Sequence, residues 1–145
     1  MSPVRFASEA WIAAVVEGVN RHPDLPRALA GLGPDLALVV EADPAARMPG
    51  VAAWGRQAGG RIAEWRVLED EDDVLELEPA YVVRGPYRLW KDAMQGRLDP
   101  VQAALAGRFR VKGDLEGLVR QANFRYIVDE ALRAVATEFP DEVGR

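Results

Sequence analysis

Near the start of the chain, apolar residues recur every three or four positions, which is the spacing of one face of a helix. Ser8, a residue type that caps helix starts, is followed at this spacing by Trp11, Ile12, Val15, Val16 and Val19. The pattern predicts a helix over residues 9–20. A second, shorter helical segment is expected over residues 22–30, because two glycines follow it closely.

The middle of the chain contains four short apolar segments with the composition of β-strands. They are rich in β-branched and aromatic residues, and they cover residues 34–42, 51–57, 61–69 and 80–85. Gly59 and Gly60 predict a hairpin between the second segment and the third. We expect the acidic run from Glu69 to Glu78 to be a solvated loop, because blocks of like charge repel one another.

After these strands, apolar residues at helical spacing predict a helix over residues 86–96. The stretch that follows contains residues that mark where its helices and strand begin and end. It covers residues 96–119 and reads GRLDPVQAALAGRFRVKGDLEGLV. Asp99 is a helix cap with Pro100 in the first helical turn, where the missing N–H of proline costs nothing. Gly107 is placed to end this short helix.

Residues 108–112 of the same stretch alternate strictly between basic and apolar side chains, which predicts a fifth strand with one solvated face. Asp114 then caps a last helix, whose apolar stripe continues to about residue 136. The order of elements is typical of the α+β class. We expect residues 1–145 to form one domain with a five-stranded, mostly antiparallel sheet that is covered by helices on one side.

Composition narrows the class of protein. Of the 145 residues, 18 are lysine or arginine and 23 are aspartate or glutamate, and the net charge of −5 disfavours a nucleic-acid partner. The absence of cysteine excludes disulfides and thiolate chemistry, and it fits a reducing compartment, so we expect a cytoplasmic protein. We expect no integral membrane segment, because every long apolar run is interrupted by charge. The apolar stretch near the start lacks a cleavage site and is interpreted as a helix of the mature protein.

Few side chains are suited to catalysis. Hydroxyl groups of serine and threonine occur only at Ser2, Ser8 and Thr137, and His22 is the single histidine. A nucleophilic site needs a nucleophile, a base and an orienting group in contact, so we assign no catalytic residue and expect no enzyme. The acidic run lacks the central glycine and the spaced oxygen ligands of a calcium loop, and we expect neither a metal nor a cofactor.

Large aromatic residues lie on elements that we expect to converge beneath the helices. They are Trp54, Trp65, Tyr81, Trp90 and Phe109. Such residues either fill a core or line an apolar cavity for a small molecule, and the pattern leaves both interpretations open.

The stretch at residues 96–119, together with the order of elements, resembles the sterol carrier protein type 2 family. That family has a similar segment, with an Asp/Asn-Pro helix start, a glycine and an alternating basic and apolar strand that ends in glycine. The corresponding positions here are Gly96, Arg97, Leu98, Asp99, Pro100, Gly107, Arg108, Phe109, Arg110, Val111, Lys112 and Gly113. The resemblance, strongest over residues 79–120, is to a stand-alone bacterial member of the family.

The resemblance implies an apolar tunnel between sheet and helices that holds a fatty acid, a sterol-like lipid or an acyl-CoA, without cofactor or metal. By position, the tunnel would be lined by Tyr81, Val83, Phe109 and Val111, and closed by Leu89, Trp90, Met94, Leu118 and Ala122. The expected lining is completed by Leu38, Val40 and Trp65.

Three hypotheses about function follow from these observations. The first is a non-enzymatic lipid-binding or carrier protein, in which the transfer of apolar groups from water drives uptake. The alternative is an interaction module with a filled core, which forms a homodimer through an exposed strand edge. An enzyme that uses a buried carboxylate is the third hypothesis, and the composition favours it least.

Overall fold

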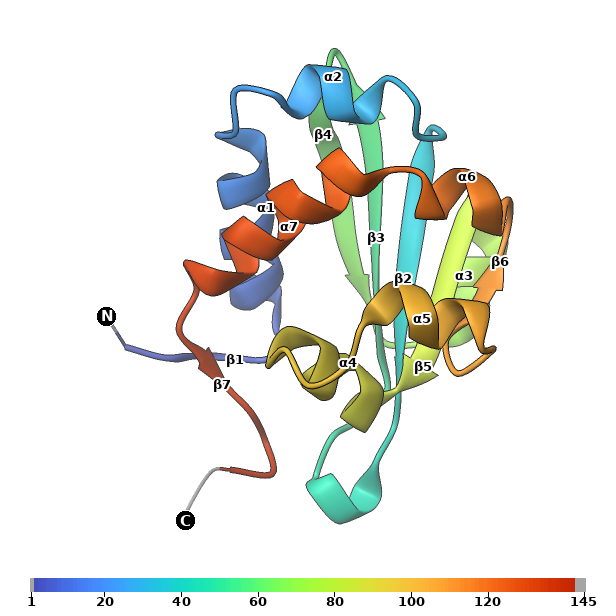
Figure 1. Cartoon of the computed structure of the whole chain (residues 1–145). Coiled ribbons are helices and arrows are strands. Elements are labelled where there is room, and N and C mark those ends of the chain that lie inside the picture. Colours follow the sequence, from blue (N-terminus) through green and yellow to red (C-terminus); the bar gives the residue numbers. More distant parts are fainter. Residues whose placement is uncertain (1, 143–145) are drawn as a thin grey trace.

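A five-stranded sheet forms the centre of the protein, and the computed structural model describes residues 2–142 (Figure 1). The strands are β2 (Asp35–Glu41), β3 (Val51–Ala58), β4 (Arg61–Leu68), β5 (Tyr81–Pro86) and β6 (Arg110–Lys112), in the order β4-β3-β2-β5-β6. All neighbouring strands in this sheet are antiparallel except β2 and β5, which are parallel. The predicted α+β class with a five-stranded, mostly antiparallel sheet is confirmed.

The hairpin between β3 and β4 forms where the sequence predicts it. Gly59 and Gly60 have φ angles of 65° and 78°, in the left-handed region that two-residue hairpin turns of this kind require. The register of the hairpin shifts between Arg56 and Gln57. As a consequence, Ile62 of β4 packs with the residues of α2 and α7.

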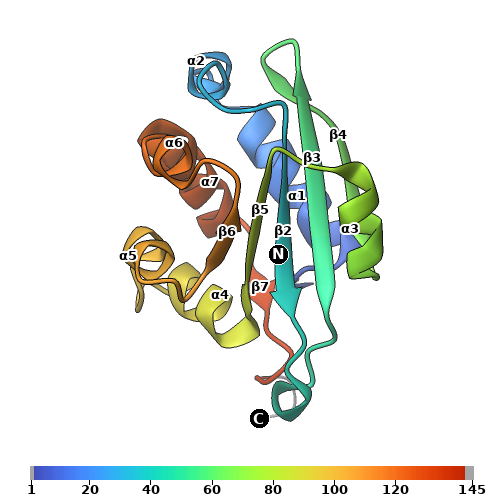
Figure 2. The same ribbon diagram turned by 90° about the vertical axis from the view of Figure 1, so that its right-hand side faces the viewer.

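Helices cover both faces of the sheet. Figure 2 shows α4 (Tyr87–Met94), α5 (Pro100–Leu105), α6 (Leu115–Val119) and α7 (Ala122–Arg133) on one side of the sheet. On this side α7 packs against α1 (Glu9–Asn20) and α2 (Leu25–Leu29). The opposite face carries α3 (Glu71–Leu77). The sequence-based expectation that helices cover only one side is therefore wrong.

Helix α3 replaces the loop that we expected in the acidic run. The side chain of Asp70 caps it by accepting a hydrogen bond from the backbone N–H of Asp72 at 2.9 Å. Val74 is buried in a cluster with Val39, Ala52 and other residues of the sheet. The buried Val74, together with the partly buried Leu77, anchors this short helix, and most of its other side chains face water, which explains the high density of charge.

The last predicted helix is divided into two. α6 and α7 are separated by Arg120 and Gln121, and the side-chain amide of Gln121 donates hydrogen bonds to the carbonyls of Gly31 and Gly117. The bond to Gly31 fixes the break between α6 and α7 next to the chain that follows α2. The predicted caps are confirmed, because Ser8, Asp99 and Asp114 accept hydrogen bonds from the backbone N–H groups of Trp11, Val101 and Gly117.

Three small elements complete the chain. A 3₁₀ turn, η1 (Pro44–Ala46), follows β2, and β1 (Val4–Arg5) pairs in parallel with β7 (Thr137–Glu138), away from the main sheet. The indole of Trp11 donates a hydrogen bond to the hydroxyl of Thr137 at 2.9 Å. The two ends of the described chain are therefore joined beside α1.

Candidate functional site

The face of the sheet beneath the helical layer carries two rows of side chains that run across the strands. The first row consists of Val67, Ala53, Leu38, Val83 and Val111, one from each strand. The second row consists of Trp65, Gly55, Leu36 and Tyr81. Both rows are apolar, and Gly55 leaves a gap between Trp65 and Leu36 because it has no side chain.

These rows are less buried than the opposite face, although more helices lie above them. Every residue of the first row is only half-buried, including Leu38 on the central strand β2. On the opposite face, under the single helix α3, Ala37 and Val39 of the same strand are almost fully buried. Side chains of the helical layer therefore leave part of this apolar surface accessible to solvent.

Near α4 the helix-facing surface of the sheet is covered by packed aromatic rings. The rings of Trp90 and Phe109 lie edge to face with centroids 4.8 Å apart, and Leu89 and Ala103 pack with them. The Trp90 indole donates a hydrogen bond to the carbonyl of Gly85 at 3.0 Å. A Cβ atom at Gly85 would lie 2.5 Å from the Phe109 ring, so this close approach requires glycine.

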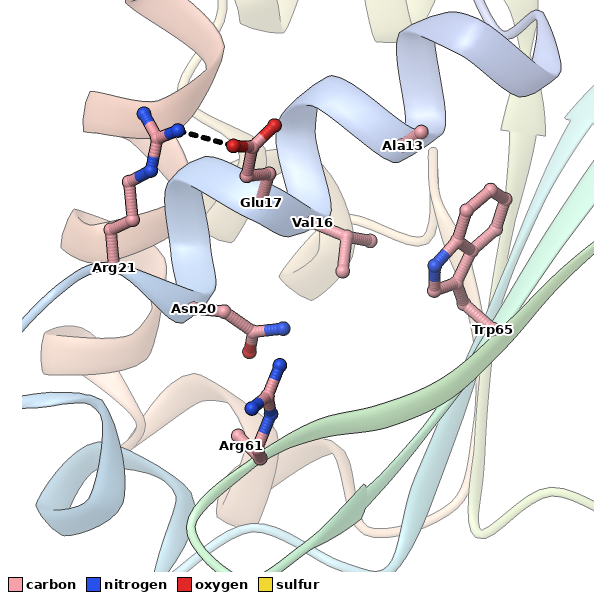
Figure 3. Close-up of a pocket in the computed structure, with 7 residues that line it drawn as sticks. All are labelled: Ala13, Val16, Glu17, Asn20, Arg21, Arg61 and Trp65. Atoms are coloured by element: carbon pink, nitrogen blue, oxygen red, sulfur yellow. Dashed lines mark hydrogen bonds and ion pairs between the residues drawn. The ribbon is translucent and has the colours of Figure 1, made fainter.

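At the other side, a groove of about 420 Å³ lies between α1 and β4, and we call it the α1–β4 groove. It is lined by Ala13, Val16, Glu17, Asn20, Arg21, Arg61 and Trp65. Figure 3 shows the Trp65 ring on β4 near Ala13 and Val16, and the Arg61 guanidinium pointing towards Asn20. The groove is thus apolar at one end and polar at the other, and its volume is within the usual range of small-molecule sites, about 300–1,000 Å³.

The polar end of the groove offers one positive charge to a ligand. Arg21 forms an ion pair with Glu17 one turn before it on α1, and these two charges neutralise each other. The Asn20 amide is engaged by the backbone of Ile62, which it bonds at 3.1 Å and 2.9 Å. Among the side chains that the structure describes, none forms an ion pair with Arg61. An anionic group in the groove would therefore meet Arg61.

The fold was compared with known proteins. Protein-family models and curated proteins give no match. A crystal structure of sterol carrier protein 2 is 26% identical, covers 91% of this chain and 100% of its own, and superposes with a TM-score of 0.74. The chain has the sterol carrier protein 2 fold.

Two further solved structures share this fold. The solution structure of a conserved hypothetical protein from Thermus thermophilus is 26% identical, covers 95% of this chain and 94% of its own, and has a TM-score of 0.75. The apo form of sterol carrier protein 2 from Yarrowia lipolytica is 8% identical, covers 94% and 98%, and has a TM-score of 0.57. The resemblance seen in residues 96–119 therefore predicted the fold correctly.

The sterol carrier fold brings some of the predicted lining residues together and places others in packed clusters. The helix-facing rows contain Leu38, Trp65, Tyr81, Val83 and Val111. Clusters of packed side chains contain Val40, Leu89, Trp90, Met94 and Phe109, and Val83 of the first row also packs against the cluster of Leu89 and Phe109. The two remaining positions are Leu118, half-buried in α6, and Ala122, exposed at the start of α7. Of the twelve, Trp65 alone also lines the α1–β4 groove.

Sequence reasoning missed the residues that give the groove its chemistry. Arg61 starts β4 directly after the hairpin, and no motif distinguishes it from the other arginines. Val16 was assigned only to the apolar face of its helix. Gly55 carries a usable signal, because glycine inside a strand often marks a place where another group approaches the backbone closely.

The described residues contain neither a cluster of metal ligands nor a helix that could span a membrane. Within residues 2–142, no three histidine, cysteine or acidic residues are grouped to hold a metal ion. Over the same residues, no helix has the length and apolar composition to cross a bilayer. The single histidine, His22, places its Nε2 atom 3.3 Å from the Glu130 carboxylate and links the end of α1 to α7.

Proposed function

We propose that this protein is a non-enzymatic carrier for a lipid that combines one apolar chain with an anionic head group, as in a fatty acid or an acyl-CoA. The observation that carries the proposal is the uncovered apolar surface of Leu38 and its row beneath the helices. The solved structure named sterol carrier protein 2 shares the fold over nearly the whole chain, and its name supports a lipid as the general class of ligand.

The apolar surface supplies the affinity in this proposal. Each methylene group that leaves water contributes about 0.8 kcal/mol, so an acyl chain laid along the two rows binds strongly without any specific polar contact. The gap at Gly55 gives the chain space between Trp65 and Leu36. The only polar side-chain groups in the two rows are the indole N–H of Trp65 and the hydroxyl of Tyr81, so the surface offered to the acyl chain is almost entirely apolar.

Arg61 supplies the selectivity for an anionic head group. Its guanidinium lies at the polar end of the α1–β4 groove, beside the apolar end formed by Val16 and Trp65. An Arg–carboxylate or Arg–phosphate hydrogen bond is about twice as strong as one between neutral groups. A sterol carries only a hydroxyl group and would not use this charge, which is why we favour acidic lipids over sterols.

The proposal is tested by native mass spectrometry of gently purified protein, followed by displacement of a fluorescent fatty acid. We expect co-purified acidic lipid and saturable displacement by palmitate. Arg61→Gln should weaken palmitate binding about tenfold, or about 1.4 kcal/mol, and leave binding of the matched fatty alcohol unchanged. Arg97→Gln, at an exposed arginine after α4, is the control and should change neither. A protein that carries no lipid and binds no fatty acid would reject the carrier function.

A further inference from the structure

The face of the sheet that carries α3 has the shape of a step. α3 contacts β3 and β4, and Val74 fixes it there in a buried cluster with Ala52 and Trp54. Beside the helix, a groove of about 270 Å³ extends over β5 and β6. It is lined by Val74, Leu75, Val82, Arg84, Arg110, Val111 and Lys112. The helix is thus a ridge over one half of the face, and the other half is a lower surface.

The ridge is acidic and has an apolar residue at its centre. Leu75 is 61% exposed, which is unusual for a leucine in a helix that also buries Val74. The acidic side chains of Asp72, Asp73 and Glu76 on the same helix are all exposed, and Asp72 lies one turn before Leu75. We call this surface the acidic ridge.

The lower surface is basic. Arg84 and Arg110 are direct cross-strand partners on β5 and β6, and Lys112 follows on the same face. Arg84 and Arg110 both form ion pairs with Glu41, whereas no described side chain forms one with Lys112. No described side chain of α3 is ion-paired with Arg110 or Lys112, although the ridge borders the same groove. We call Arg84, Arg110 and Lys112 the basic strip.

We infer that this face is a self-complementary docking surface for a second copy of the chain. A twofold axis beside Leu75 would place the acidic ridge of each copy over the basic strip of the other. The Leu75 side chain of each copy would then enter the apolar part of the opposite groove, against Val82. Ridge and strip match in shape and in charge, and one rotation satisfies both contacts at once because a twofold interface uses the same patch twice.

Two other occupants fit this surface less well. Pairing of β6 edges from two copies would bring Arg110 and Lys112 opposite the same basic residues, and like charges directly across strands are destabilising. An anionic bilayer would attract the basic strip but repel the acidic ridge next to it, on a chain whose net charge is already −5. A second copy alone uses both charged surfaces.

The dimer is expected to be weak and sensitive to salt. Both copies carry a net charge of −5, so their long-range repulsion opposes association and only the local complementarity favours it. Salt reduces the Debye length from about 10 Å at 0.1 M to about 3 Å at 1 M and screens these exposed contacts. We therefore expect the dimer in sedimentation experiments at high protein concentration and low salt, and its dissociation at 1 M salt.

A mixing experiment with two charge-reversed variants tests the inference. Asp73→Lys with Glu76→Lys makes the ridge basic, and Arg110→Glu with Lys112→Glu makes the strip acidic. Each double variant should be monomeric alone, because ridge and strip then repel. A mixture of the two should form a heterodimer, because each ridge meets a strip of opposite charge in both contacts.

Leu75→Asp provides an independent test, and Arg97→Glu is the exposed control. Leu75→Asp should abolish the dimer while leaving the circular dichroism spectrum and fatty-acid binding unchanged, since the groove for the ligand lies on the other face. Arg97→Glu should leave the dimer intact. The inference is overturned if the unmodified chain stays monomeric at low salt, if its dimer survives Leu75→Asp, or if the two variants fail to associate on mixing.

Discussion

At the scale of single residues, the most unusual group is a buried lysine. The Lys91 side chain on α4 is 10% exposed, and its ammonium lies 3.0 Å from the Asp141 carboxylate and 2.9 Å from that of Glu142. The Tyr87 hydroxyl donates a hydrogen bond to the same Asp141 carboxylate at 2.6 Å. These contacts fasten the segment after β7 to the start of α4, and with it the lower end of the helical layer.

We expect Lys91→Met to destabilise the protein by about 3–5 kcal/mol, because it leaves the buried Asp141 carboxylate without its cation. The measurement is urea denaturation at neutral pH. Arg133→Met removes an exposed ion pair with Asp129 and should cost less than about 1 kcal/mol. Equal losses in the two variants would show that the buried cluster contributes nothing beyond a surface pair.

At the scale of elements, the two faces of the sheet differ in how tightly their side chains are packed. Gly55 faces the helical layer, and a Cβ atom added there would meet Ile62 at 3.6 Å, which is ordinary van der Waals contact. On the neighbouring strand β2, Ala37 faces α3 and is fully buried. Substitution by leucine should therefore affect the stability of the protein differently at Gly55 and at Ala37.

Gly55→Leu is expected to fold with stability close to that of the unmodified protein, because the added Cβ atom would meet Ile62 only at ordinary contact distance and glycine inside a strand is unfavourable. It should also reduce fatty-acid affinity at least tenfold by occupying the gap between Trp65 and Leu36. Ala37→Leu should cost about 1–3 kcal/mol through overpacking and leave the ligand site intact. Thermal denaturation and fluorescent displacement report both effects, and a Gly55→Leu protein as unstable as Ala37→Leu would contradict the looser packing of the helix-facing surface.

Elements with strong local signals were predicted from the sequence, and those that depend on distant partners were not. Helix α1 and the β3–β4 hairpin follow from Ser8 and from Gly59-Gly60, which act on their own neighbours. Helix α3 was missed because its apolar contacts are few, and its burial of Val74 depends on a sheet face formed by other segments. The break between α6 and α7 depends in the same way on Gln121 and the carbonyl of Gly31.

The candidate site shows the same difference between what local patterns predict and what depends on distant segments. Apolar residues of the rows, such as Leu38 and Val83, could be predicted because strand parity places them on one face. Whether Phe109 and Trp90 fill the space above them is decided by the packing of α4 and α5, which no pattern in the strand reveals. The sequence shows which residues are apolar, and the tertiary structure decides which of them stay uncovered.

At the scale of the whole molecule, the buried cluster makes stability depend on pH at both extremes. Burial opposes the charge of Asp141, but the hydrogen bonds from Tyr87 and Lys91 hold the pKa of this carboxyl below its ordinary value. Burial and the hydrogen bond to Asp141 raise the pKa of Tyr87. Burial disfavours the charge of Lys91, yet its hydrogen bonds to Glu142 and Asp141 raise the pKa of this ammonium.

The sign of each effect follows from these shifts. The contribution of Asp141 is present above the unfolded-state pKa of about 3.9 and is lost as the pH falls through its lower folded-state value. The contributions of Tyr87 and Lys91 are present below about pH 10 and are lost as the pH rises through their higher folded-state values. We expect urea stability to fall below about pH 5 by more in the unmodified protein than in Asp141→Asn. Parallel acid limbs in the two proteins would contradict this account.

The pairing of β1 with β7 has a consequence for how the protein is made. The amide of Phe6 donates to the carbonyl of Glu138 at 2.9 Å, and the Phe6 ring packs against Phe139 with centroids 5.6 Å apart. Trp11 bonds to Thr137 across a separation of 126 residues. A chain growing on the ribosome thus completes α1 long before the partners of these two rings have been synthesised. Until residues 137–139 have been synthesised, Phe6 and Trp11 lack these partners, and a nascent chain that stalls before this point would present both rings to chaperones.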